Sequence, residues 1–289
     1  MIVSAIQMNC TEHVQENIVH AEALVREAVQ KGANIVLLPE LFERLYFCQE
    51  RRYEYYQYAK SVQENDAVQH FQKLCRELHI VMPVSFYEKD GNVLYNSVAM
   101  IDADGKLLGV YRKTHIPDDH FYQEKFYFTP GNTGFKVWET AFGRVGVGIC
   151  WDQWFPEAAR AMTLQGAQLL LYPTAIGSEP ILNCDSMEHW QRCMQGHAAA
   201  NIIPVIAANR YGLEKVKSCM ENGGQESALH FYGSSFITDE TGEILTQAER
   251  AGDTVLTAQL DLCQIEKARL EWGLFRDRRP DCYRILTET

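Results

Sequence analysis

Short apolar runs along the chain alternate with longer segments in which apolar residues recur every three or four positions. The runs predict strands and the longer segments predict helices, and the first forty residues already show a β-α-β order in which Gly32 ends the helix. Strands are expected at residues 2–8, 33–38, 80–85, 107–112, 145–149, 168–172, 204–208 and 254–260. Helices are expected at about 12–30, 64–78, 156–165 and 186–201, and near the C-terminus before a basic tail at 276–280.

The segments between these elements divide into turns and one long loop. The pairs Asp90-Gly91 and Asp104-Gly105, and the run 239–242, are typical of hairpin turns. Residues 114–134 are rich in Asp, Pro, Gly and aromatic residues without a steady period, which predicts a long functional loop. Because no linker or repeat divides the sequence, we expect residues 1–289 to form a single α/β domain with hairpins added to layered sheets.

Composition narrows the class of protein. The 289 residues are 46% hydrophobic and carry a formal net charge of -11, which disfavours nucleic acid as the main partner and mildly favours a cationic small molecule. No apolar run reaches the roughly 18 residues of a membrane helix, and the N-terminus has no signal-like segment, so we expect a cytoplasmic protein that does not bind a membrane. Nine cysteines without a C-x-x-C pair predict reduced thiols, and nine histidines without ligand spacing predict no metal.

Cys150 stands where the strand 143–149 ends and a turn begins before the helix that Pro156 opens. A nucleophile at such a strand-to-helix corner is exposed at the sheet edge, and nearby backbone N–H groups favour its thiolate. The position alone is equally compatible with a small cysteine of the core.

Two charged residues also follow apolar strands. Glu40 comes after the run 35–38, and a carboxylate at the carboxyl end of a strand points into the crevice where open α/β sheets bind ligands, so it is a candidate general base. Lys113 ends the strand 107–112, where its ammonium could stabilise a developing oxyanion. The simpler alternatives are a helix cap or surface carboxylate for Glu40 and a solvated lysine for Lys113.

In order and spacing, these three residues resemble the nitrilase superfamily of carbon-nitrogen hydrolases. The matching segments are Leu38-Pro39-Glu40, Tyr111-Arg112-Lys113-Thr114-His115 and Gly148-Ile149-Cys150-Trp151-Asp152. The resemblance implies a four-layer αββα sandwich, a catalytic set of Glu40, Lys113 and Cys150, and a second glutamate, Glu124, which is otherwise a surface charge of the loop. It also implies self-association as a homodimer or larger homo-oligomer, with no cofactor.

Residues 150–157 resemble the N-carbamoylputrescine amidohydrolase branch of this family. The resemblance implies a thiol amidohydrolase that cleaves a small cationic ureido substrate to putrescine, carbon dioxide and ammonia. Glu40 would deprotonate Cys150 for attack on the carbonyl, Lys113 and the backbone N–H of Trp151 would bind the oxyanion, and Glu124 would hold Lys113 and the substrate nitrogen. The alternatives are an omega-amidase, a carbamoyl amino acid hydrolase, a nitrilase, or, from another class, a non-catalytic scaffold subunit.

The cationic end of such a substrate requires an acidic partner. Four methylenes separate the amine from the ureido group by about 6 Å, so a selective pocket should hold a carboxylate at that distance. Glu179, in the loop after the strand 168–172, is the first candidate unless it is merely solvated, and Asp118 and Asp119 in the long loop are the alternatives. His120 is a candidate for shaping the site, although the family pattern assigns the role of base to Glu40.

Two apolar segments are candidates for the subunit contact. The aromatic run 53–58 and the helical segment 151–162 offer more apolar side chains than a solvated surface should expose.

Overall fold

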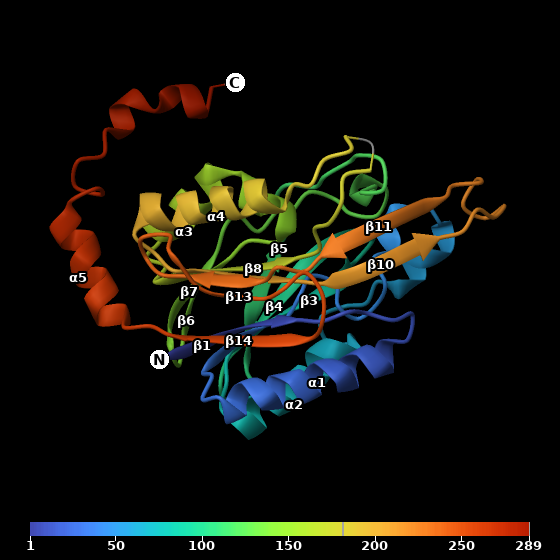
Figure 1. Ribbon diagram of the computed structural model, residues 1–289, viewed down its shortest axis with the longest axis horizontal. Helices are drawn as coiled ribbons and strands as arrows, with labels where there is room; N and C mark the ends of the chain where they lie inside the picture. Colours follow the sequence, from blue (N-terminus) through green and yellow to red (C-terminus); the bar gives the residue numbers. More distant parts are fainter. Residues whose placement is uncertain (181, 289) are drawn as a thin grey trace.

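The computed structural model describes residues 1–180 and 182–288, and its elements follow the order that the apolar pattern predicts (Figure 1). The α-helices are α1 (Val14–Gln30), α2 (Asp66–Leu78), α3 (Pro156–Leu164), α4 (Met187–Asn201) and α5 (Leu262–Trp272). The strands are β1 (Ile2–Gln7), β2 (Ile35–Leu37), β3 (Met82–Asp90), β4 (Val93–Ile101), β5 (Leu107–Arg112), β6 (Val137–Thr140), β7 (Gly143–Val147), β8 (Leu169–Thr174), β9 (Val205–Asn209), β10 (Tyr211–Val216), β11 (Ser227–Tyr232), β12 (Phe236–Thr238), β13 (Ile244–Gln247) and β14 (Thr254–Gln259).

One side of the molecule is built around β1. This strand pairs antiparallel with β14 and parallel with β2, in the order β14-β1-β2. A backbone bridge between Ile35 and Val81 joins β2 to the start of β3, and β3, β4 and β5 continue as an antiparallel meander. The hairpin turns predicted at Asp90-Gly91 and Asp104-Gly105 connect these three strands.

The second sheet has the order β13-β12-β9-β8-β7-β6. Its central strands β7, β8 and β9 are parallel, and α3 and α4 connect them. Parallel strands place their carboxyl ends at the same edge of a sheet. The segments that follow β7 and β8 therefore lie next to each other.

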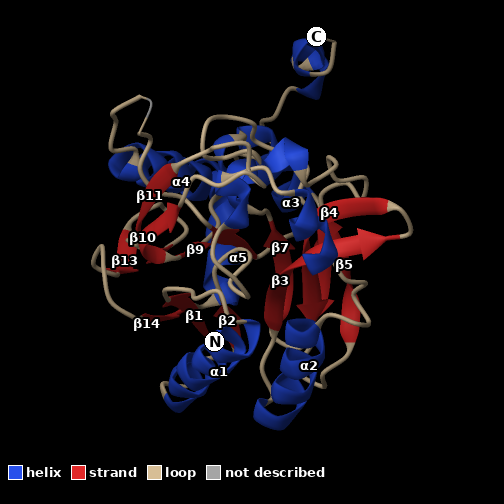
Figure 2. Cartoon of the chain, turned by 90° about the vertical axis from the view of Figure 1, so that its right-hand side faces the viewer, coloured by secondary structure: helices blue, strands red, loops and turns tan. Residues whose placement is uncertain are grey.

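Helices cover the outer faces of both sheets, so the layers follow the order αββα (Figures 1 and 2). On α1, Ile18, Ala21, Val25 and Ala28 are buried at helical spacing and pack against the first sheet, while α3 and α4 pack against the second. A third apolar cluster fills the space between the sheets. The predicted four-layer sandwich is thus confirmed. Within the described residues, no helix has both the length and the apolar character needed to cross a membrane.

A hairpin that the apolar pattern did not predict is formed by β10 and β11. Residues alternate between buried and exposed along β11, and Leu213 of β10 is 55% exposed, because only one face of the hairpin packs on the body. Its polar residues and short strands give a weak signal in the sequence. The short strand β6, which pairs with β7 at the sheet edge, was also missed.

The end of the chain extends away from the sandwich (Figure 1). The Arg269 guanidinium of α5 donates hydrogen bonds to the carbonyl oxygens of Ala167 and Ile202, which attaches this helix to the body. Beyond it, short 3-10 turns at Pro280–Cys282 and Arg284–Leu286 lead to the C-terminus, and apolar side chains of this part of the chain, including Trp272 and Ile285, remain exposed. We refer to residues 262–288 as the C-terminal arm.

Candidate active site

Cys150 begins a short 3-10 helix, Cys150–Trp154, directly after the extended residues that follow β7. Its φ of 42° lies in the left-handed region, which is unusual for a residue other than glycine and is found at strained functional turns. The thiol donates a weak hydrogen bond to the Ala175 carbonyl oxygen, 3.8 Å away, just beyond β8. The neighbouring ends of β7 and β8 thus form this corner.

The expectation that Cys150 is exposed and that its thiolate is favoured was wrong. The residue is only 6% exposed, and it lines a cavity together with residues of the long loop such as Ile116 and Tyr122. Burial raises the pKa of the Cys150 thiol well above its ordinary value; the Glu40 carboxylate raises it further, and Lys113 only partly opposes this. The resting group is therefore a thiol, and attack requires a base that accepts its proton.

Glu40, Lys113 and Glu124 form one buried cluster. Lys113 Nζ donates to Glu40 Oε1 at 2.8 Å and to Glu124 Oε2 at 2.7 Å. Glu40 follows β2, Lys113 follows β5, and Glu124 opens the short 3-10 helix Glu124–Phe126 in the long loop. The backbone N–H of Glu40 also donates to the Thr174 carbonyl oxygen at the end of β8, which ties the two sheets together here.

The charges of this cluster are strongly coupled. Burial alone would lower the pKa of Lys113, but Glu124 and Glu40 outweigh it, and the pKa is raised well above its ordinary value. Lys113 is therefore a fixed cation. Burial raises the pKa of Glu124 to about 7. The Lys113 ammonium lowers this pKa and the Glu40 carboxylate raises it, so Lys113 offsets only part of the effect of burial.

Glu40 has one oxygen available for proton transfer. Its Oε1 accepts hydrogen bonds from Lys113 Nζ and from Asn96 Nδ2 at 2.7 Å, whereas none of the described residues donates a hydrogen bond to its buried Oε2. A buried carboxylate oxygen without a donor is a strong acceptor for a nearby proton. The arrangement thus leaves one carboxylate oxygen of this buried cluster able to accept a proton.

Three supporting residues were not predicted from the sequence. Asn96 of β4 positions Glu40, Tyr46 OH donates to Glu124 Oε1 at 2.7 Å, and Arg210 donates to the backbone carbonyl oxygen of Glu40 at 2.7 Å. All three are fully buried or nearly so. The sequence signal that could have identified them is a polar residue inside an otherwise apolar segment. An assignment based on apolar periodicity does not use such single polar residues.

A cavity of about 300 Å³ opens above the thiol. Its lining includes the predicted substrate residues Trp151, Glu179, Asp118 and Asp119, together with Glu124. Glu179 is half-buried, and burial followed by the charge of Asp119 raises its pKa to about 7. The structure therefore brings four carboxylates from two different loops to the same cavity.

The two histidines of the long loop lie elsewhere. His120 is exposed, packs beside Phe121 and is not part of the cavity lining. His115 donates through Nδ1 to Asp152 at 2.8 Å, and its ring stacks on Phe155. A role for His120 in shaping the substrate site therefore has no contact to support it.

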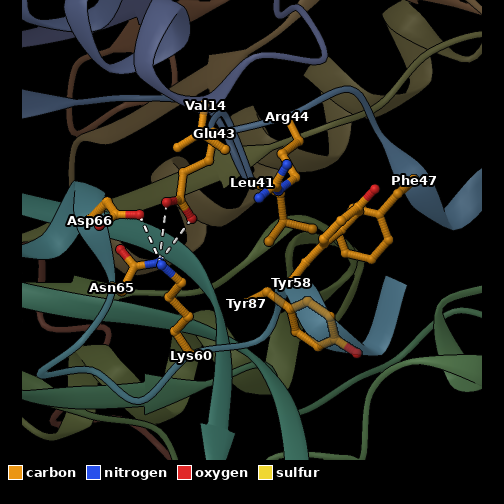
Figure 3. A pocket seen from close by; sticks show the side chains of 10 residues that line it. All are labelled: Val14, Leu41, Glu43, Arg44, Phe47, Tyr58, Lys60, Asn65, Asp66 and Tyr87. Atoms are coloured by element: carbon orange, nitrogen blue, oxygen red, sulfur yellow. Dashed lines mark hydrogen bonds and ion pairs between the residues drawn. The ribbon is translucent and has the colours of Figure 1, made fainter. Parts of the chain in front are cut away.

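A second cavity, behind Leu41, measures only about 20 Å³ (Figure 3). Asn65 Nδ2 donates to both oxygens of Glu43 at 3.1 Å, and burial raises the pKa of that carboxyl to about 7. The space is sufficient for about one water molecule and too small for an organic substrate. In the part of the chain that the structure describes, no group of three or more His, Cys, Asp or Glu side chains could hold a metal ion.

The predicted aromatic run Tyr53–Tyr58 forms a 3-10 helix whose rings turn partly inward. Tyr55 stacks on Tyr58, and Tyr56 stacks on Phe126, so that of these tyrosines only Tyr53, at 75%, is strongly exposed. The run therefore offers less free apolar surface than its sequence indicates.

Comparison with known proteins identifies the family of the chain. Residues 2–270 match the model of the carbon-nitrogen hydrolase family, and the chain belongs to this family. It is 57% identical to an N-carbamoylputrescine amidase of Oryza sativa subsp. japonica, over 98% of this chain and 93% of the relative. It is 52% identical to a citrullinase of Francisella tularensis, over 97% of this chain and 96% of the relative. The crystal structure of a carbon-nitrogen hydrolase from Helicobacter pylori G27 superimposes with a TM-score of 0.91 at 36% identity, covering 100% of this chain and 98% of that one. The family resemblance of the three motifs is thereby confirmed.

Proposed function

We propose that the protein is a thiol amidohydrolase that cleaves N-carbamoylputrescine to putrescine, carbon dioxide and ammonia. The observation that carries this proposal is the cavity that combines the Cys150 thiol with the carboxylates of Glu179, Asp118 and Asp119. A ureido carbon needs the nucleophile, and the ammonium at the other end of the substrate needs negative charge. The amidases of rice and other plants, at 54% to 57% identity, add support.

The first half of the reaction uses the buried cluster. Glu40 Oε2, which lacks a hydrogen-bond donor, takes the Cys150 proton while the sulfur attacks the ureido carbon. The resulting oxyanion is stabilised by Lys113 Nζ and the backbone N–H of Trp151. The fixed charge of Lys113 contributes several kcal/mol of stabilisation at this point, in the range known for oxyanion-hole donors.

The second half returns the enzyme to its resting state. Protonated Glu40 gives its proton to the departing ammonia, and the carbonyl carbon remains bound to sulfur as a thiocarbamate that carries the putrescine nitrogen. Glu40 then takes a proton from water, which attacks this carbon. The C–S bond breaks, Glu40 returns the proton to the Cys150 sulfur, and the released N-alkyl carbamic acid breaks down to carbon dioxide and putrescine. Glu124 orients Lys113 and accepts a hydrogen bond from the substrate nitrogen. Every step uses groups of this chain, without a cofactor.

A second candidate is hydrolysis of citrulline, a ureido amino acid. Its carboxylate requires a cationic group, and Lys125 lines the same cavity as Glu179. The citrullinase of Francisella tularensis, at 52% identity, makes this substrate a necessary comparison. The two substrates differ only at the end remote from the carbonyl, so the chemistry is common to both.

Release of ammonia from a matched panel tests the proposal. The panel contains N-carbamoylputrescine, citrulline, an omega-amide, an aliphatic nitrile and a neutral N-alkyl urea. We expect the highest kcat/KM with N-carbamoylputrescine. A higher value with citrulline would replace the proposed substrate, and no thiol-dependent release from any compound would favour a non-catalytic subunit.

We also infer that the protein self-associates as a homodimer or larger homo-oligomer. The C-terminal arm leaves Leu270, Trp272 and Ile285 at 81%, 73% and 67% exposure, and Trp151, just before α3, is 38% exposed. Apolar side chains gathered on a projecting segment are typical of a protein interface. A second copy of this chain is the partner that the family resemblance implies.

A further inference from the structure

The backbone at Cys150 is held in a conformation that needs support. Its φ of 42° is unfavourable for a side chain with a Cβ, and such conformations persist only where the surroundings fix them. Gly148, two residues earlier, cannot be replaced without a clash, since an added Cβ would lie 2.8 Å from the Tyr172 ring. The backbone before the nucleophile is therefore packed closely against the Tyr172 ring.

Asp152 supports this conformation of the backbone. It is fully buried, and its Oδ2 accepts hydrogen bonds from the backbone N–H of Ile149 at 2.9 Å and from Tyr111 OH at 2.7 Å. The bond to Ile149 closes the turn around Cys150, in the manner of a side chain that caps a helix start. Loss of this acceptor would leave the buried Ile149 N–H without its partner, and the Tyr111 hydroxyl would keep only its contact with Thr114 Oγ1 at 3.0 Å.

The other oxygen of Asp152 holds a different segment. Its Oδ1 accepts the backbone N–H of His115 at 3.0 Å and His115 Nδ1 at 2.8 Å. His115 lies two residues after Lys113, and Tyr111 lies two residues before it. One carboxylate thus joins the turn that carries the nucleophile to both sides of the residue that carries the fixed cation.

We propose that Asp152, with Tyr111 and His115, is a positioning unit for the reaction: it fixes the Cys150 turn relative to Lys113, so that sulfur, ammonium and the Trp151 N–H converge on one carbonyl group. This inference rests on the proposed thiol mechanism, although not on the identity of the substrate. The unit touches neither substrate nor sulfur, and it acts through the backbone of residues 149–151 and 113–115. A displacement of about 1 Å between reacting groups can lower a rate by about a hundredfold, so small shifts at this link are sufficient.

Conservative variants separate positioning from folding. Tyr111→Phe keeps the buried ring and removes the hydroxyl, with its bond to Asp152 and its contact with Thr114 Oγ1. His115→Phe removes the Nδ1 bond but keeps the backbone N–H and the stacking on Phe155. Asp152→Asn replaces one acceptor oxygen with a donor that faces other donors, so it should have the largest effect. If Asp152→Asn does not fold, the first two variants still test the proposal.

The chain offers a matched control. Asp253 also accepts a tyrosine hydroxyl, from Tyr211, and a histidine nitrogen, from His20 at 2.8 Å, and neither residue lines the cavity. Tyr211→Phe and His20→Phe therefore remove the same kinds of bond at a distant carboxylate. They should leave both readouts below unchanged.

The first readout is steady-state kinetics with whichever panel compound the wild type hydrolyses fastest. We expect about a tenfold loss of kcat for Tyr111→Phe and His115→Phe and about a hundredfold loss for Asp152→Asn, with KM within about twofold. Binding is spared because the three residues do not line the cavity. A rise in KM with kcat unchanged would overturn the proposal.

The second readout does not require a substrate. Alkylation of Cys150 by iodoacetamide is followed by peptide mass spectrometry from pH 6 to 9, with the exposed Cys263 and Cys282 as internal references. We expect each variant to react more slowly than wild type at pH 7, and its rate to continue rising toward pH 9, because a displaced thiol loses the help of Glu40. An unchanged or faster rate at pH 7 would refute the positioning role. If no panel compound is hydrolysed but the alkylation result is as expected, the substrate assignment fails while the positioning unit stands.

Discussion

Replacement of Glu179 by glutamine tests how the cavity selects a cationic substrate. The side chain is half-buried beside Asp119 in the loop after β8, and the change removes its charge while keeping its size. For an ammonium about 4 Å from the carboxylate, the Coulomb energy is about 4 kcal/mol at an effective dielectric constant of 20 and about 1 kcal/mol in water. A half-exposed pair lies between these limits, at roughly 2 kcal/mol. Because 1.36 kcal/mol corresponds to a factor of ten, kcat/KM should fall about thirtyfold.

The assay compares two substrates of equal length. Ammonia release from N-carbamoylputrescine should lose the full factor, whereas release from a neutral N-alkyl urea should change by less than about twofold. Glu139→Gln, at an exposed position of β6 outside the cavity, controls for the loss of one negative charge from the protein. Equal losses on both substrates would mean that Glu179 supports the loop and does not bind the ammonium. If neither substrate lost activity, Asp118 or Asp119 would be the residue that binds the ammonium.

The remaining predictions concern the nucleophile, the base, the pH dependence and assembly. Cys150→Ser should fold normally and lose several orders of magnitude in kcat, since a hydroxyl is a far weaker nucleophile at neutral pH; near-normal turnover would remove Cys150 from the mechanism. Glu40→Gln should abolish turnover, with a small change in melting temperature, because the amide cannot accept the proton; an active Glu40→Gln alongside an inactive His120→Ala would indicate a Cys-His enzyme. Burial raises the pKa of Glu179 to about 7, so this carboxyl group is mostly neutral at pH 6 and ionised at pH 8. The kcat/KM for the cationic substrate should therefore rise between pH 6 and pH 8 more steeply than the kcat/KM for the neutral urea. Parallel pH profiles would contradict this prediction. Light scattering should show a particle larger than 33.1 kDa at micromolar concentration, and a monomer alone would contradict self-association.

The amino-acid sequence by itself determined the order of the main elements and the principal site candidates. Strands buried on both faces, such as β2 and β8, have almost entirely apolar sequences, and α1 has apolar residues at helical spacing, so local pattern was sufficient to predict them. Glu40, Lys113 and Cys150 were recognised as candidates because each lies within three residues of the end of a strand. A residue in that position lies at the carboxyl end of a strand whatever the order of strands in the sheet. The family resemblance then assigned the three residues to one catalytic set.

Only the tertiary structure decided which groups meet and how far they are buried. Tyr46 and Glu124 are hydrogen-bonded although 78 positions separate them, and the partners Arg210 and Glu40 are 170 positions apart. Periodicity indicates whether a side chain is buried but not which neighbour it contacts. These hydrogen bonds could therefore not be predicted from the apolar pattern. The same limit explains the wrong expectation for Cys150: a corner after a strand is exposed in isolation, and here the long loop covers it. Burial then makes the resting group a thiol, because desolvation disfavours a thiolate more than the nearby backbone hydrogen bond stabilises it.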